Sequence, residues 1–363
     1  MGSASSERIR HRIGHVGKSQ APHSSIPILP SCTRVNIPLA CYPICWLNNL
    51  MSESSDNQKI DEVDFWPGHP ISYTTTQIVL RVGDTDIGSG TGFVLQYARQ
   101  YALITNWHVL SGRSPIDRKC LSKTGAIPMR AAFHVALVKT EKLDDGRTSE
   151  LIHFRPVDIE LYENGELDKP VWFDDVTEDS VLDVAAIPLA NYLPELEDKS
   201  YSLRCIDGGK VTLKRGVKPT SKIKSEDVAH YYPNVGRQVF IVGYPAGIEH
   251  NGIFPIWKNG SIASEPIASV RLSGRTTTDA FYVDGLTRSG MSGSPVICLT
   301  EKGEKLLTAD GVQVIMSKDE PYLLGVYAGR EGVTQSESDL ALGRVWKVEG
   351  LERLLSRIYA SPK

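Results

Sequence analysis

From Ile71 onward the chain consists of short apolar runs rich in β-branched and aromatic residues, each bounded by turn residues. Runs of this length, recurring at close intervals, are typical of the strands of an all-β domain. The clearest runs are 77–82, 91–95, 101–105, 132–139, 149–154, 181–189, 238–245, 260–264, 280–284 and 323–330. Few segments carry a helical period, and the clearest one runs from Val345 through Ile358. The sequence therefore predicts an all-β fold that ends in one amphipathic α-helix.

Between two of these runs lies the segment Gly290-Met291-Ser292-Gly293-Ser294-Pro295. Glycine at 290 and 293 allows the backbone to bend sharply and to present N–H groups to a developing oxyanion. Ser292 is therefore a candidate nucleophile. The alternative is an ordinary glycine-serine turn between two strands. Other residues must decide, because a serine hydroxyl is a weak nucleophile without a base.

A candidate base and a candidate acid occur upstream of this serine. His108 follows the run 101–105, and we expect a strand that ends at this histidine. Asp183 stands at the head of the apolar segment 181–189, where a carboxylate is partly buried and needs a partner. Three neighbouring acids are rival candidates, namely Asp174, Asp175 and Asp179. Asp183 is preferred because it alone leads directly into the strand that would anchor it.

Taken in order, these stretches resemble the catalytic blocks of the trypsin/chymotrypsin-like serine peptidases. Gly90-Thr91-Gly92-Phe93 resembles their glycine-rich strand pair, and Thr105-Asn106-Trp107-His108-Val109 resembles their histidine block. Asp183-Val184-Ala185-Ala186-Ile187 resembles the aspartate block, and residues 290–295 resemble the serine block. The resemblance extends from about Ser72 to Tyr359. It is strongest to the bacterial branch that includes high-temperature-requirement and glutamyl-endopeptidase-like enzymes.

The resemblance implies two six-stranded antiparallel β-barrels and a C-terminal α-helix. We expect the first barrel in residues 65–190, with the histidine and the aspartate, and a linker in 191–234. The second barrel, with the serine, and the helix would occupy 235–363. No PDZ-like module is expected after the second barrel.

Residues 1–64 differ from the rest of the chain. Up to Leu50 they contain one acid, Glu7, against five strong bases, together with many serines and several prolines. Such a composition cannot bury a core. It is consistent with a disordered tail, with a targeting peptide, or with an upstream translation that precedes a true start at Met51.

The function implied by the resemblance is that of a serine endopeptidase. Ser292 would attack the peptide carbonyl, His108 would act as general base and then general acid, and Asp183 would orient the imidazole. The backbone N–H groups of Gly290 and Ser292 would form the oxyanion hole. No metal or cofactor is implied. A competing hypothesis is a catalytically silent or partner-activated scaffold that binds peptides or proteins.

Two departures from the animal digestive enzymes affect activation and specificity. Met291 stands where those enzymes carry an aspartate, so we expect no activation by a newly cut N-terminus that pairs with that acid. Leu286 stands at the expected floor of the specificity pocket, which predicts cleavage after small or medium apolar residues. Arg330 could instead favour an acidic residue. The expected substrate-binding residues are Leu286, Thr287, Tyr327, Ala328, Gly329 and Arg330.

Composition limits the other classes of partner. The net charge is −3 and the apolar fraction is 41%, so neither nucleic acid nor a membrane is expected as the main partner. The segment 141–180 holds thirteen acids and four bases, which we interpret as a solvated loop face. The expected partner is a polypeptide substrate, and a regulatory protein partner is left open. The six cysteines show no metal or redox spacing, which favours reduced thiols and a cytoplasmic location.

Overall fold

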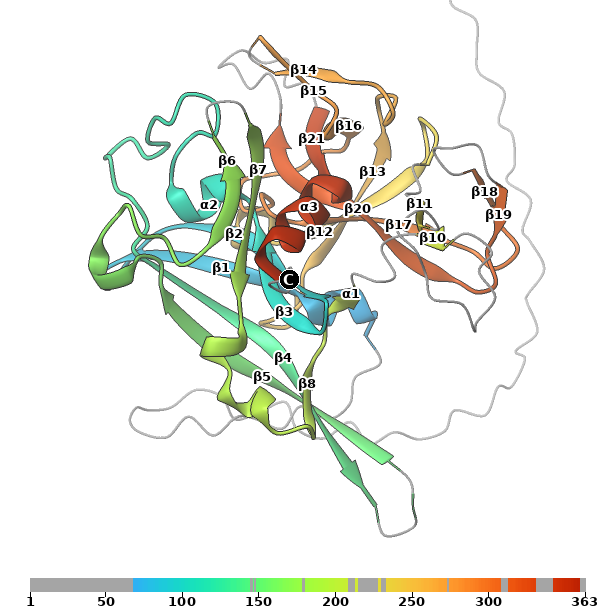
Figure 1. The fold of residues 1–363 in the computed structure, drawn as a ribbon, viewed down its shortest axis with the longest axis horizontal. Coiled ribbons are helices and arrows are strands. Elements are labelled where there is room, and N and C mark those ends of the chain that lie inside the picture. The colour runs from blue at the N-terminus through green and yellow to red at the C-terminus, as the bar shows by residue number, and fades with distance from the viewer. Residues whose placement is uncertain are drawn as a thin grey trace, which may run out of the picture. The chain divides into compact units, whose positions relative to one another are not determined.

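The computed structural model describes residues 68–143, 146, 148–177, 180–207, 213–214, 228–229, 233–272, 274–307, 313–330 and 342–359. The extension predicted for 1–64 therefore lies outside the described residues. Within the described part, strands dominate and one long helix lies near the C-terminus (Figure 1). The predicted all-β class and the C-terminal helix are confirmed.

The first half forms one nine-stranded sheet with the order β5-β4-β1-β2-β3-β7-β6, with β8 paired to β4 and β9 paired to β2. Its strands are β1 (Thr75–Val82), β2 (Thr85–Tyr97), β3 (Gln100–Thr105), β4 (Arg130–Lys142), β5 (Thr148–Glu160), β6 (Phe173–Val176), β7 (Val181–Pro188), β8 (Tyr201–Leu203) and β9 (Ile206–Asp207). The resemblance implied a six-stranded barrel here, and the described pairings give a nine-stranded sheet instead. The short strands β8 and β9, which lie within the range expected as a linker, also join this sheet.

The second half forms the closed six-stranded barrel that the resemblance implied. Its order is β12-β13-β16-β21-β20-β17, with every neighbouring pair antiparallel. The strands are β12 (Gln238–Gly243), β13 (Ile256–Ile262), β16 (Ala280–Asp284), β17 (Pro295–Thr300), β20 (Glu320–Arg330) and β21 (Leu342–Lys347). Apolar side chains alternate inward along these strands and fill the barrel with a buried core.

The remaining elements of the described chain are two-stranded ribbons and short helices. Among the described residues, three two-stranded ribbons pair β10 with β11, β14 with β15 and β18 with β19. Their bounds are β10 (Leu213–Lys214), β11 (Val228–Ala229), β14 (Val270–Leu272), β15 (Arg275–Thr277), β18 (Lys305–Leu307) and β19 (Gln313–Ile315). The short helices are α1 (Pro70–Thr74), α2 (Trp107–Ser111), η1 (Glu163–Gly165), η2 (Ala190–Tyr192), η3 (Pro194–Glu197) and η6 (Pro245–Gly247).

The helix α3 (Val348–Tyr359) packs against strands of both halves. It contacts β6 and β7 of the first sheet and β20 and β21 of the barrel (Figure 1). Leu351, Leu354 and Leu355 are buried, as the helical spacing predicted. A Cβ at Gly350 would lie 2.9 Å from Leu182, so the helix approaches β7 closely beside the candidate acid.

Two local predictions need correction. The sequence placed the second strand run at 91–95, but β2 already begins at Thr85, because Val82 pairs with Thr85 in a tight hairpin. The strand expected to end at His108 ends at Thr105 instead, and His108 lies in α2.

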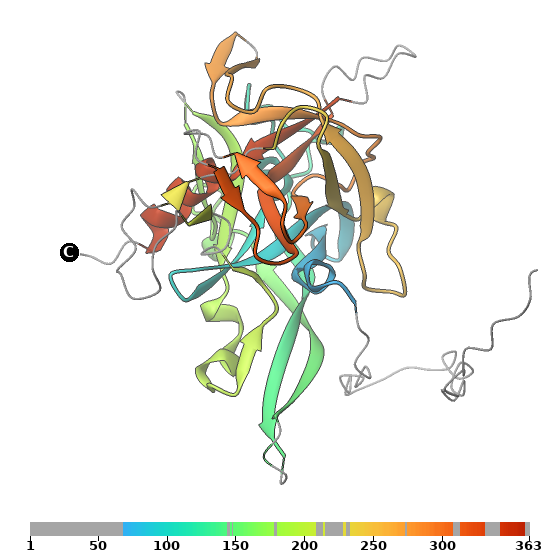
Figure 2. The same ribbon diagram turned by 90° about the vertical axis from the view of Figure 1, so that its right-hand side faces the viewer.

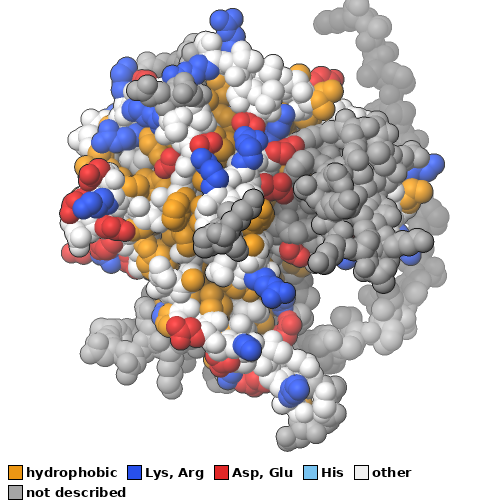
Figure 3. All heavy atoms as spheres, viewed as in Figure 1, with side chains coloured by type: hydrophobic (Ala, Val, Ile, Leu, Met, Phe, Trp, Pro, Cys, Tyr) orange, Lys and Arg blue, Asp and Glu red, His pale blue; other side chains and the backbone are white. Residues whose placement is uncertain are grey.

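The hairpin of β4 and β5 projects from the rest of the described chain in both ribbon views (Figures 1 and 2). Acidic and basic side chains are interspersed on the face seen in Figure 3. Cys120, Cys205 and Cys298 are thiols, and the other three cysteines lie outside the described residues. No helix among the described residues is long and apolar enough to cross a membrane.

Candidate active site

His108 lies in the first turn of the five-residue helix α2. Asn106 precedes this helix in an extended conformation, and Gly112 ends it with a positive φ of 65°. A left-handed residue of this kind is a common helix terminator, and glycine adopts it at little cost. The chain therefore turns sharply after β3, which places His108 just beyond the end of this strand.

Asp183 on β7 holds His108 through both of its carboxylate oxygens. The distance from His108 Nδ1 to Asp183 Oδ2 is 2.6 Å, and the His108 backbone N–H donates to Asp183 Oδ1 at 2.9 Å. The Asn106 amide donates to the Asp183 carbonyl oxygen at 2.6 Å. The Asp183 side chain is only 1% exposed. A carboxylate can only accept, so Nδ1 carries the shared proton and Nε2 is left as an acceptor in the neutral ring.

The rival acids have other partners. Asp174 accepts hydrogen bonds from Trp172 Nε1 at 2.9 Å and from the Val176 N–H at 3.0 Å. Asp175 forms an ion pair with Arg357 at 3.0 Å. Asp179 lies outside the described residues. Of the described candidates, Asp183 is therefore the one that meets His108.

Ser292 occupies a tight turn that leads into β17. Gly290 and Gly293 have φ values of 91° and 89°, which disfavour any residue with a Cβ. A Cβ at Gly290 would collide with the Tyr244 carbonyl oxygen, and one at Gly293 would collide with the Thr91 carbonyl oxygen. The glycines are thus required both by conformation and by close packing.

The backbone around Ser292 is fixed by hydrogen bonds to β20. The Gly293 N–H donates to the Tyr327 carbonyl oxygen at 2.8 Å, and the Tyr327 N–H donates to the Ser294 carbonyl oxygen at 2.9 Å. Met291, at the position of the digestive enzymes' aspartate, is fully buried in the barrel core. An apolar residue is therefore part of the packing that holds this turn.

The histidine helix and the serine turn adjoin each other at Gly90 on β2. A Cβ at this position would lie 2.7 Å from Val109 Cγ1 and 3.4 Å from the Ser292 carbonyl oxygen. The Thr91 N–H donates to that same Ser292 oxygen at 2.8 Å. Two segments far apart in the sequence thus contact the same strand of the first sheet.

The two backbone N–H groups expected to form the oxyanion hole are not used in the backbone hydrogen bonding of the described chain. The preceding carbonyl, that of Ser289, accepts a hydrogen bond from the Ala246 N–H at 2.6 Å. Gly290 O accepts a hydrogen bond from the Thr91 hydroxyl at 2.7 Å. Among the described residues, neither the Gly290 N–H nor the Ser292 N–H donates to a backbone carbonyl.

The expected substrate-binding residues separate into an exposed and a buried group. Leu286 is 54% exposed, so it does not form the enclosed apolar floor that the sequence suggested. Thr287 is buried, and its hydroxyl shares a hydrogen bond with the Tyr327 hydroxyl.

Ala328, Gly329 and Arg330 end β20. A Cβ at Gly329 would lie 3.7 Å from Ser292 Oγ, so this end of the strand runs beside the candidate nucleophile.

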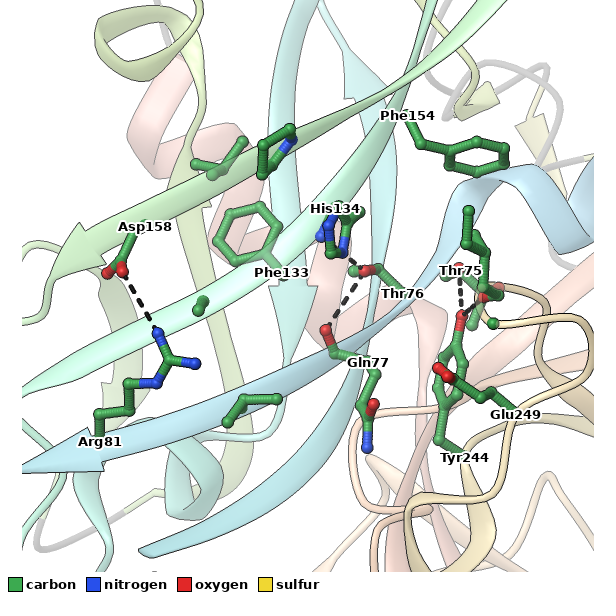
Figure 4. Close-up of a pocket in the computed structure, with 16 residues that line it drawn as sticks. Thr75, Thr76, Gln77, Arg81, Phe133, His134, Phe154, Asp158, Tyr244 and Glu249 are labelled. Atoms are coloured by element: carbon green, nitrogen blue, oxygen red, sulfur yellow. Dashed lines mark hydrogen bonds and ion pairs between the residues drawn. The ribbon is translucent and has the colours of Figure 1, made fainter. Parts of the chain in front are cut away.

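A separate cavity of about 650 Å³ lies between β1, β4, β5 and the loop after η6 (Figure 4). None of the predicted catalytic or substrate-binding residues lines it. Tyr244 extends into its wall, where its hydroxyl donates to the carbonyl oxygens of Thr75 and Ile253. Burial raises the pKa of this phenol, so it stays protonated and can serve as that donor.

Sequence reasoning did not assign a role to Thr91, Asn106 or Tyr244, although all three contact the site. Thr91 and Asn106 lie within segments that carried the resemblance, which was the one available signal. No group of three or more metal-binding side chains occurs in the part of the chain that the structure describes.

Comparisons with known proteins place the chain in a family. Residues 90–304 match the model of the trypsin-like peptidase domain, a range that contains His108, Asp183 and Ser292. No curated protein matches the chain.

Three solved structures share a low sequence identity with the chain. The active form of the Rv3671c protease from M. tuberculosis is 15% identical, with 86% of this chain and 96% of that chain covered and a TM-score of 0.38. The serine endoprotease from Yersinia pestis is 12% identical over 80% and 65%, with a TM-score of 0.37. Deg5 is 14% identical over 81% and 93%, also with a TM-score of 0.37. Similarity this low carries no argument, and the match to the family model decides. The chain belongs to the family of trypsin-like peptidase domains, whose substrates are polypeptides.

Proposed function

We propose that this protein is a serine endopeptidase that hydrolyses peptide bonds through Ser292, His108 and Asp183. The observation that carries the proposal is the contact of 2.6 Å between His108 Nδ1 and the buried Asp183 Oδ2. A buried carboxylate that fixes one imidazole nitrogen leaves the other as a base, which is the arrangement that activates a serine hydroxyl.

In the acylation step, Ser292 Oγ forms a bond to the substrate carbonyl carbon while its proton passes to His108 Nε2. The tetrahedral intermediate collapses as the C–N bond breaks, and the imidazolium returns the proton to the leaving amine. Water then attacks the acyl-enzyme with the same histidine as base. The products are a carboxylic acid and an amine, and Ser292 is regenerated.

Asp183 supports this cycle by orientation and by charge. Its two contacts to residue 108 restrain the ring and the backbone together. When the ring becomes positively charged, the buried carboxylate compensates that charge at short range. The Asn106 amide holds the backbone of Asp183 and thereby the position of the acid.

The backbone N–H groups of Gly290 and Ser292 are proposed to hold the oxyanion. Support comes from the Ser289 carbonyl, which bonds to Ala246 and so orients the following N–H away from that contact. Donors that are fixed before the reaction stabilise the developing charge without reorganisation.

The substrate main chain would lie along the end of β20, at Tyr327 to Arg330. Gly329 leaves room beside Ser292 Oγ for an extended peptide, and strand addition of this kind supplies main-chain hydrogen bonds. The preference for small or medium apolar residues stays a prediction from the sequence alone, because the exposed Leu286 does not form the enclosed apolar floor from which it was inferred.

The proposal is tested by labelling the full chain with a fluorophosphonate serine-hydrolase probe. We expect labelling of the wild type and none of Ser292→Ala or His108→Ala. Ser294→Ala is a matched control in the same turn, because the Ser294 hydroxyl is buried and finds no hydrogen-bond partner among the described residues. A folded wild type that does not react would contradict the proposal and favour the catalytically silent scaffold.

A further inference from the structure

Thr91 on β2 belongs to the first sheet, but its polar groups contact the serine turn. Its hydroxyl donates to Gly290 O at 2.7 Å, and its backbone N–H donates to Ser292 O at 2.8 Å. The residue is completely buried. These two bonds join Thr91 to residues about two hundred positions away in the sequence.

The direction of the hydroxyl hydrogen follows from a third contact. The Tyr244 N–H donates to Thr91 Oγ1 at 3.2 Å, so the oxygen accepts there and its own hydrogen is left for Gly290 O. Tyr244 is itself anchored, because its phenol bonds to the carbonyl oxygens of Thr75 and Ile253 (Figure 4). The Thr105 hydroxyl donates to the Thr91 carbonyl oxygen at 2.7 Å, which fixes the strand from the other side.

These contacts fix the peptide groups that alternate with the oxyanion donors. Thr91 holds the carbonyl of the 290–291 peptide and the carbonyl of the 292–293 peptide. The Ser292 N–H belongs to the 291–292 peptide between them. Gly290 has no side chain to restrain it. Two hydrogen bonds hold the 290–291 peptide: the Met291 N–H donates to the Arg288 carbonyl oxygen at 3.3 Å, and the Thr91 hydroxyl donates to Gly290 O at 2.7 Å. The Thr91 bond is the shorter of the two, and it ties this peptide to the first sheet.

We propose that Thr91 is a positioning residue whose hydroxyl holds the 290–291 peptide in the orientation that keeps the Gly290 and Ser292 N–H groups directed at the reacting carbonyl. The inference rests on the proposed function, because it assigns those two groups to the oxyanion hole. Thr91 itself touches neither the substrate nor the reacting atoms.

The packing favours threonine over a similar apolar residue for a chemical reason. A Cβ at Gly243 would lie 2.7 Å from Thr91 Oγ1 and 3.2 Å from Thr91 Cγ2, so the residue fills its site closely. Valine matches the shape of threonine but can neither donate nor accept. Thr91→Val would therefore leave both Gly290 O and the Tyr244 N–H without their partner. Serine keeps the hydroxyl and loses only the methyl group.

The test compares Thr91→Val, Thr91→Ser and wild type in the second-order rate of fluorophosphonate labelling and in kcat and KM for peptide hydrolysis. We expect Thr91→Val to lose about 10- to 100-fold in both the labelling rate and kcat, with KM within about twofold. Thr91→Ser should stay within about threefold of wild type. A Thr91→Ser variant that keeps these rates would show that the hydroxyl group is required and that the packing of the methyl group is not.

Thr300→Val is the matched control, because the buried Thr300 hydroxyl also donates to a backbone carbonyl, that of Glu320, at 2.9 Å. It should react like wild type. Thermal unfolding of each variant reports folding, and Thr91→Ala replaces Thr91→Val if valine prevents folding. Two results would overturn this inference and leave the proposed function standing. In the first, the wild type reacts and the folded Thr91→Val or Thr91→Ala variant reacts equally fast. In the second, Thr91→Ser loses as much of the labelling rate and kcat as Thr91→Val. A wild type that does not react overturns this inference together with the proposed function.

Discussion

Replacing Asp183 by asparagine is the perturbation with the largest predicted effect at constant shape. The asparagine amide can still accept from the His108 backbone N–H, as Asp183 Oδ1 does at 2.9 Å. Its NH₂ group, however, donates where Oδ2 accepted, so the ring proton moves from Nδ1 to Nε2. A protonated Nε2 cannot take the proton of Ser292.

The magnitude follows from the lost charge and the lost tautomer. Two unit charges about 4 Å apart interact by about 4 kcal/mol at an effective dielectric constant of about 20. That is about three orders of magnitude in rate, and the wrong tautomer adds to it. We therefore expect Asp183→Asn to lower kcat/KM by about 10³- to 10⁴-fold.

The assay measures peptide hydrolysis and the fluorophosphonate labelling rate on folded variants. Asp174→Asn serves as a matched control, because Asp174 also accepts two hydrogen bonds near β7 but does not touch His108. It should retain wild-type rates. A folded Asp183→Asn variant within about tenfold of wild type would refute the reasoning.

Four further predictions concern the turn, the core, the helix and the specificity. Gly293→Ala should lower the free energy of unfolding in urea by about 2–4 kcal/mol, because the new Cβ combines a positive φ with a collision against the Thr91 carbonyl oxygen. A variant as stable as the wild type would contradict this. Met291→Asp should lower the free energy of unfolding in urea by about 3–5 kcal/mol, because it buries an unpaired carboxylate. A loss under about 1 kcal/mol would refute the buried position of residue 291. Burial raises the pKa of Glu349 and Glu352 on α3 to about 7 from 4.5, so the folded state binds more protons than the unfolded state in this window and stability falls as pH rises through it. Glu349→Gln should therefore stabilise the protein by about 1–2 kcal/mol at about pH 8 and by little at about pH 4.5. Equal changes in stability at the two pH values would contradict the raised pKa of Glu349. A peptide library should show cleavage after small or medium apolar residues, and preference for arginine or lysine would overturn that expectation.

The sequence predicted the features that depend on local pattern. Short apolar runs rich in β-branched and aromatic residues predicted β12, β16 and β20, and the helical spacing after Val345 predicted α3. The glycines at 290 and 293 predicted a tight turn, and both have the positive φ that glycine adopts at little cost. These signals are local because each arises from the backbone preferences of a few consecutive residues.

Features that depend on short elements or distant contacts could not be predicted in this way. The helix α2 has five residues, too few to display a helical period, so His108 was expected at the end of a strand. The strands β8 and β9 have three and two residues and carry no alternation. The bonds from Thr91 to the serine turn join the two halves of the fold, and no pattern within either segment encodes them.

The central claim is that Ser292 is the nucleophile, and peptide mapping after reaction with a fluorophosphonate tests it most directly. Tandem mass spectrometry of the digested protein should locate one phosphonate adduct on Ser292 in the wild type and none in His108→Ala. An adduct on Ser289 or Ser294 instead, or no adduct on a folded wild type, would contradict the account.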